Sequence, residues 1–76
     1  MRKLRIDYDS PVDALVAIAK RLSNYEMQYQ MESEAFFDNF SKGLSKDSED
    51  FVEWANDYKH YIDIRREIEV SLQHAA

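Results

Sequence analysis

The chain has 76 residues, a formal net charge of -5, one glycine and one proline, a composition typical of a single small helical domain and not of a β-sandwich. It contains no cysteine, which excludes disulfides, thiolate metal sites and cysteine nucleophiles. No apolar run approaches the roughly 18 residues of a membrane helix, and the first ten residues lack the apolar stretch of a signal peptide. We therefore expect a cytoplasmic protein that does not enter membranes.

The first residues differ from the rest of the chain in pattern and in charge. Polar and apolar residues alternate from Lys3 to Tyr8, as in a half-buried β-strand. Arg2, Lys3 and Arg5 against Asp7 leave the first eight residues at +2 (three minus one), so the remainder carries -7. We interpret residues 1–9 as an extended segment that forms a short strand.

A first helix is predicted from about residue 11 to residue 29. Ser10 can cap its free N–H groups, Pro11 suits the first helical position, and Asp13 completes a pattern like a capping box. Apolar residues recur at helical spacing on one stripe and polar residues face away from it. The stripe holds Leu15, Ile18, Leu22, Tyr25 and Tyr29, and the opposite face holds Lys20, Arg21, Asn24 and Gln28.

A second, shorter helix should begin with Ser33 as its N-cap. Gly43 supplies the left-handed residue that ends it, and we expect Leu44 to pack just beyond. Three phenylalanines mark its buried face: Phe36, Phe37 and Phe40.

The third helix should begin among residues 47–49 and continue to about Leu72. Acidic residues in its first turn suit the positive end of the helix dipole. One broad apolar stripe runs along it, opposite a polar face. The stripe holds Phe51, Trp54, Ala55, Tyr58, Tyr61, Ile62, Ile68 and Leu72, and the polar face holds Glu49, Glu53, Asn56, Asp57, His60, Asp63 and Glu67.

These elements predict an all-α fold, in which residues 10–76 form one three-helix domain. Two long helices should pack antiparallel, and the short helix should close one end of the pair. The N-terminal strand is an optional addition to this domain.

The residues that could carry chemistry do not form a complete site. Asp57 and His60 have a spacing that can bind a metal, with Glu53 one turn earlier, but a helical-bundle site needs such ligands from facing helices. The first helix has no histidine, His60 has no clear nucleophile partner, and one glycine cannot make a phosphate loop. We predict no enzymatic activity, no metal and no cofactor.

Nucleic-acid binding is open in one form only. A helix-turn-helix is rejected because the third helix would present acidic residues to the phosphates. A ribbon-helix-helix dimer is a better match, since paired N-terminal strands could present Lys3 and Arg5 to the major groove.

Six residues of the third helix are candidates for binding a partner protein. Glu49, Glu53 and Asp57 step at four-residue spacing, so a basic partner would relieve their mutual repulsion. Arg65 and Glu69 interrupt the apolar stripe, as an ion pair with packed stems or as a contact with another protein. The candidate set is Glu49, Glu53, Asp57, Tyr61, Arg65 and Glu69.

Two stretches, DSPVDALVAIAKRLSNYEMQYQMESEAFFDNFSKG and DFVEWANDYKHYIDIRREIE, resemble a family of small acidic proteins from cyanobacteria and other bacteria. Members read YDSP-x-x-AL-x-x-x-AKRLS-x-YE, then a short helix containing FF, then FVEWA-x-x-Y-x-x-Y. The family is associated with two-gene operons that also encode a small toxin, usually as the antitoxin.

The resemblance implies a non-enzymatic protein-binding module that neutralises the toxin encoded beside it. We expect a homodimer or a hetero-oligomer with that toxin. Two alternatives remain: the ribbon-helix-helix DNA-binding dimer and a structural or adaptor subunit.

Overall fold

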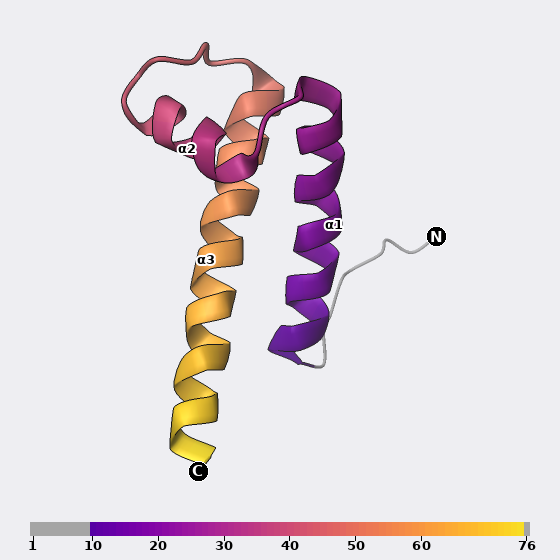
Figure 1. The fold of residues 1–76 in the computed structure, drawn as a ribbon, viewed down its shortest axis with the longest axis vertical. Helices are drawn as coiled ribbons and strands as arrows, with labels where there is room; N and C mark the ends of the chain where they lie inside the picture. The colour runs from indigo at the N-terminus through magenta and orange to yellow at the C-terminus, as the bar shows by residue number, and fades with distance from the viewer. Residues whose placement is uncertain (1–9, 76) are drawn as a thin grey trace.

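The computed structural model describes residues 10–75. Within this range the chain forms three helices and no strand: α1 (Pro11–Tyr29), α2 (Ser33–Ser41) and α3 (Glu49–Ala75). Figure 1 shows α1 and α3 side by side and antiparallel, with α2 against the N-terminal half of α3. The predicted all-α, three-helix class is confirmed. The proposed strand, with Lys3 and Arg5, lies outside the described residues, so the DNA-binding alternative stays a prediction.

The bounds of α1 follow from local signals in the sequence. The Ser10 hydroxyl accepts a hydrogen bond from the Asp13 backbone N–H at 3.2 Å, which satisfies one of the free donors of the first turn. At the other end Gln30 adopts a left-handed φ of 55° and its N–H bonds to the carbonyl of Glu26. The predicted range of residues 11–29 is therefore confirmed.

Ser33 does not act as the N-cap of α2, and this prediction is wrong. It is the first residue of the helix, and the N-cap is Glu32, which forms no capping bond with its side chain. The Ser33 side chain is buried and its hydroxyl accepts from Trp54 Nε1 at 2.8 Å. A buried indole N–H needs an acceptor, and the nearby serine supplies it.

The end of α2 is a Schellman turn. Gly43 has a φ of 75°, its N–H bonds to Phe40 and the N–H of Leu44 bonds to Asn39, the bond pattern that defines this turn. Gly43 as the left-handed stop is thus confirmed. Leu44, expected to pack, is 71% exposed, because the connection to α3 arches away from the helices here (Figure 1).

α3 begins where the sequence predicts and ends three residues later than expected. The Ser48 hydroxyl caps it by accepting from the Phe51 N–H at 3.1 Å, and the helix continues to Ala75. No helix within residues 10–75 is both long enough and apolar enough to cross a bilayer.

Trp54 is the centre of the core. Its side chain is fully buried, and the Phe36 ring stacks on it with 3.9 Å between centroids and 1° between planes. Tyr25 and Tyr29 of α1 and Phe51 of α3 surround the same indole. Because these rings come from all three helices, the core lies at the end of the molecule that α2 covers.

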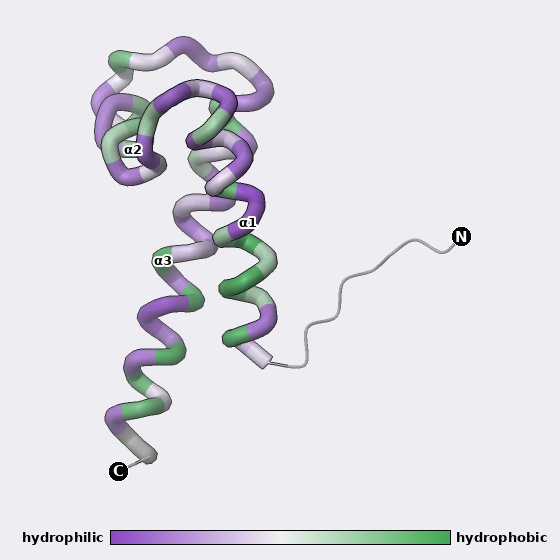
Figure 2. The backbone as a smooth tube through the Cα atoms, turned by 45° about the vertical axis from the view of Figure 1, so that its right-hand side comes forward, coloured by the Kyte–Doolittle hydropathy of each residue, from purple (hydrophilic) through white to green (hydrophobic). Residues whose placement is uncertain are grey.

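The core does not extend along the whole length of α1 and α3. Its last buried or adjoining members toward the other end are Ile18 of α1 and Ile64 of α3. Figure 2 shows hydrophobic segments continuing along both helices beyond the position of α2. The far halves of the long helices therefore carry apolar residues that no third helix covers.

Candidate partner-binding surface

The predicted acidic line of α3 lies along its seam with α1. Arg21 donates two hydrogen bonds to Asp57, from Nε at 3.1 Å and from Nη2 at 3.0 Å. The Asp57 side chain is 15% exposed, so it lies against α1 and not on an open face. The expectation that Arg21 faces away from the stripe is wrong, because its long side chain reaches across the seam from the stripe's edge.

Two tyrosines of α1 bind the next acids along the same seam. The Tyr25 hydroxyl donates to Glu53 at 3.4 Å and the Tyr29 hydroxyl donates to Asp50 at 2.6 Å. The bond to Asp50, followed by desolvation, raises the pKa of Tyr29, while burial and then the charge of Glu53 raise the pKa of Tyr25. The repulsion along the predicted line is thus offset at Asp57 by the Arg21 guanidinium, while Glu53 is exposed and has a hydrogen bond from a neutral hydroxyl.

The six predicted residues separate into two groups. Glu53 and Asp57 bind α1 at the seam, and Glu49 is exposed in the first turn of α3. Beyond the core, the guanidinium of Arg65 lies 5.8 Å from the centroid of the Tyr61 ring, and Arg65 pairs with Glu69 at 3.7 Å. The structure does not unite these groups in one surface.

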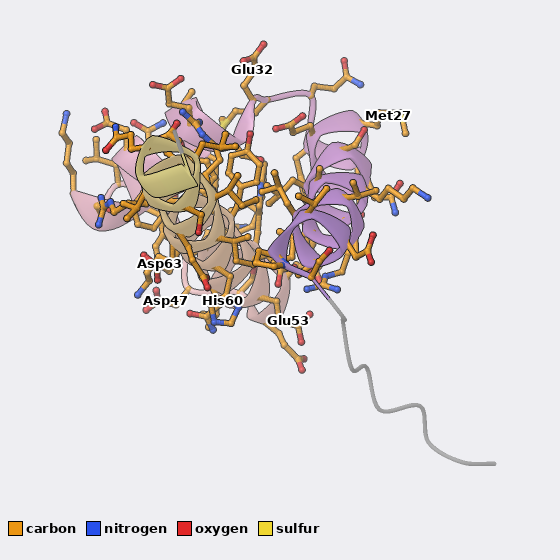
Figure 3. The ribbon with its side chains drawn as sticks, turned by 90° about the horizontal axis from the view of Figure 1, so that it is seen from below. Met27, Glu32, Asp47, Glu53, His60 and Asp63 are labelled. Carbon is orange, nitrogen blue, oxygen red and sulfur yellow. The ribbon has the colours of Figure 1, made fainter. Side chains whose placement is uncertain are left out.

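A groove opens on the other side of the molecule, between α1, the start of α2 and α3. It encloses about 290 Å³. Figure 3 shows Glu32 on this side of the helix pair and Glu53, His60 and Asp63 on the opposite side. We call this groove the acidic groove. Its lining includes three acids, two aromatic rings and one cation: Glu26, Glu32, Glu34, Tyr58, Tyr61 and Arg65.

The acids of this groove differ in whether their carboxylates already have hydrogen-bond or ion-pair partners. The Glu26 carboxylate accepts from the Ser33 backbone N–H at 2.9 Å. The carboxylates of Glu32 and Glu34 form no hydrogen bond or ion pair within residues 10–75. Burial, and then the charge of Glu34, raise the pKa of Tyr58, whereas the charge of Arg65 lowers it.

A second, wider hollow of about 600 Å³ adjoins the groove and shares Glu32, Glu34 and Tyr58 with it. Phe37 extends the aromatic floor, since its ring lies 5.2 Å from that of Tyr58. Asp38, on the rim, is paired with Lys42 at 3.1 Å. The combined surface offers aromatic area with a negative rim, which suits a ligand that is basic and partly apolar.

The sequence prediction named two residues of the acidic groove, Tyr61 and Arg65, but missed its acids, although one signal pointed to them. Glu26 falls four residues after Leu22, on the edge of the apolar stripe of α1, and a carboxylate there requires a polar partner. That partner, the N–H of Ser33, becomes visible only when the turn between α1 and α2 is known.

Among residues 10–73, whose side chains the structure describes, no three histidine, aspartate or glutamate side chains come together as a metal site would require. His60 is exposed on the polar face of α3. The absence of metal binding and of catalysis remains a prediction.

Comparisons with known proteins give no family for this chain: no family model, no curated protein and no solved structure matches it.

Proposed function

We infer that this protein is a non-enzymatic protein-binding module of the antitoxin type, which neutralises a small basic protein by direct contact. The observation that carries this proposal is the acidic groove, which Glu32 and Glu34 line together with the rings of Tyr58 and Tyr61. Neither carboxylate has a bond to any residue that the structure describes. Aromatic area provides the binding energy of an interface, and the surrounding charge selects the partner.

The charge of the expected partner follows from its chemistry. A toxin that acts on RNA needs a basic surface to hold phosphates. An acidic groove complements that surface and speeds encounter between the two proteins. A basic segment seated there would also cover the positive surface that the toxin needs for RNA.

The groove is a better candidate than the acidic line predicted from the sequence. Along that line Asp57 is already bound by Arg21 and Glu53 by Tyr25. A partner would have to compete with the Arg21 guanidinium for the charge of Asp57, whereas Glu53 is exposed and accepts only from a neutral hydroxyl. Glu32 and Glu34 carry no such bonds within the described residues.

The test measures association with the product of the neighbouring open reading frame. The double variant E32K/E34K should slow association tenfold or more at low salt. The difference should shrink in about 1 M salt, where the Debye length falls to about 3 Å. The matched control is D63K/E67K, which makes the same change of charge at exposed positions of α3. Asp63 lies on the side of the molecule opposite the groove (Figure 3).

The outcome decides between the two surfaces. If E32K/E34K associates at the wild-type rate while E49K/E53K is slowed, the partner uses the predicted acidic line and the groove proposal is wrong. If the neighbouring protein does not bind the wild-type chain at all, the antitoxin proposal itself is wrong.

A further inference from the structure

α3 has a heptad pattern that continues past the core. Successive positions are spaced alternately by three and four residues, as in a coiled coil. The first four of them belong to the core or pack against it, but the last is 67% exposed. The positions are Phe51, Trp54, Tyr58, Tyr61, Arg65, Ile68 and Leu72.

Two members of this line, with two residues from its edge, form what we call the C-terminal strip. Ile62, Arg65, Glu69 and Leu72 are spaced by three, four and three residues, so they share one face. Tyr58, one turn before Ile62, contacts Phe37 of α2. The strip therefore begins where the cover from α2 ends.

The strip is complementary to itself when its direction is reversed. An apolar residue stands at each end, with one cation and one anion between them. If a second copy lies antiparallel, Arg65 faces Glu69 of that copy and Glu69 faces its Arg65. Ile62 then faces Leu72 at both ends. Such reciprocal pairing is the geometry of a two-fold interface.

The Arg65–Glu69 pair is poorly arranged for stabilising its own helix. Its N–O distance is 3.7 Å, whereas strong charge-assisted hydrogen bonds measure roughly 2.7–2.9 Å. The cation also precedes the anion, which is the less favourable order along a helix. Both side chains therefore retain capacity for a second bond.

The surroundings of the Arg65–Glu69 pair offer space for an apolar side chain of a second copy. Arg65 is held over the Tyr61 ring, which limits the conformations it must give up on binding. A small hollow of about 160 Å³ lies between Ile62, Arg65, Arg66 and Glu69. In the antiparallel arrangement, Leu72 of the second copy is the side chain that approaches Ile62 at this hollow.

We propose that the C-terminal strip binds the same strip of a second copy of this chain, antiparallel, in a two-fold dimer with two reciprocal Arg65–Glu69 pairs. The proposal needs no other protein, but Arg65 also lines the acidic groove, so the dimer surface adjoins the surface proposed for the toxin. The strip spans ten residue steps, about 15 Å of helix, so the interface belongs to the small, reversible class. We expect a Kd on the order of 10–100 µM.

Sedimentation equilibrium of charge variants tests the pairing. R65E and E69R should each dimerise at least tenfold more weakly, because like charges then face each other twice. The swapped chain R65E/E69R should recover wild-type dimerisation. A mixture of the two single variants should form a heterodimer, since one strip is then wholly acidic and the other wholly basic. K59E and E67R, the same charge changes at exposed positions outside the strip, should have no effect.

Disulfide crosslinking tests whether the two strips pair antiparallel. The chain has no native cysteine, so only the introduced cysteines can form a disulfide. An oxidised mixture of Ile62→Cys and Leu72→Cys chains should give mainly the mixed disulfide. Circular dichroism of every variant checks that the helices persist. A wild-type chain that stays monomeric up to about 1 mM, a dimer indifferent to R65E and E69R, or a product made mainly of like-with-like disulfides would each overturn the proposal.

Discussion

The indole Nε1 of Trp54 donates a hydrogen bond to the hydroxyl of Ser33 over 2.8 Å, and this bond joins the second turn of α3 to the first residue of α2. Both groups are buried, where a net hydrogen bond contributes about 1 kcal/mol but an unmade one costs more. The backbone N–H of the same serine donates a hydrogen bond to the carboxylate of Glu26. Ser33 thus connects all three helices.

Ser33→Ala should destabilise the fold by about 1–3 kcal/mol, because the Trp54 N–H then stays buried without an acceptor. The free energy of unfolding in urea measures this loss. Ser41→Ala is the control, since Ser41 is exposed at the other end of α2 and its replacement should cost far less. Equal midpoints for the two variants would contradict the role assigned to the bond.

Trp54→Ala should cost on the order of 3–5 kcal/mol by emptying the largest buried site. A domain of this size has little stability to lose, so the variant is expected to be unfolded or nearly so. Trp54→Phe provides the milder measurement, since it retains stacking on Phe36 while removing the indole N–H. An unchanged urea midpoint in Trp54→Phe would show that neither the indole N–H nor the lost volume matters.

The sequence predicts the helices well because their ends are decided locally. Ser10, Gly43 and Ser48 act through bonds to neighbours within a few residues, and such signals need no tertiary information. Two other predictions failed for the opposite reason. Ser33 binds a residue 21 positions away and Arg21 binds one 36 positions away, and helical spacing on one segment cannot supply those distances.

The candidate site depends on contacts between helices more than the fold class does. A charge pattern shows which acids share a face of a helix, but not which helix faces them. The shielding of Asp57 was missed because Arg21 was counted only as outward, and the bond to the exposed Glu53 was missed because Tyr25 was counted only as apolar. The acidic groove depends on the turn between α1 and α2, which brings Glu32 and Glu34 next to Tyr58.

Alkaline pH should weaken the fold through Tyr29. Its hydroxyl donates to the Asp50 carboxylate, and this raises its folded-state pKa above the ordinary 10.0. The protonated form is therefore favoured on folding, so the stabilisation is complete below pH 10 and is lost as pH rises through the folded pKa.

Titration of the tyrosine ring signals by NMR measures this pKa, with Tyr29→Phe to assign the resonance. Asp50→Asn removes the charge and should lower the folded pKa toward 10.0, with a smaller loss of stability at alkaline pH. A Tyr29 titration that is identical in wild type and Asp50→Asn would refute the assignment.

Gly43→Ala should destabilise the protein by about 1 kcal/mol, because an alanine at φ 75° is strained. The strain lies in the backbone alone, since a Cβ at this position meets no atom within 4 Å. Gly43→Asn should cost less, as asparagine tolerates this conformation better. Lys46→Ala, exposed in the same connection, is the control. Unfolding midpoints that rank Asn no better than Ala would place the cost elsewhere.

The bidentate contact between Arg21 and Asp57 should couple α1 to α3 more strongly than an ordinary surface pair. Asp57 is mostly shielded while half of the Arg21 side chain is exposed, so we expect a coupling of roughly 0.5–1 kcal/mol, at the upper end for partly exposed pairs. A double-mutant cycle with Arg21→Ala and Asp57→Ala isolates this term from any other contact of Arg21. The coupling should fall as salt rises.

Asp57→Lys should then destabilise the fold more than Glu67→Lys, an exposed position of the same helix, because only the former sets a cation against Arg21. If both lysine variants unfold at the wild-type urea concentration, the seam does not depend on this pair, and Asp57 becomes available again as a docking charge.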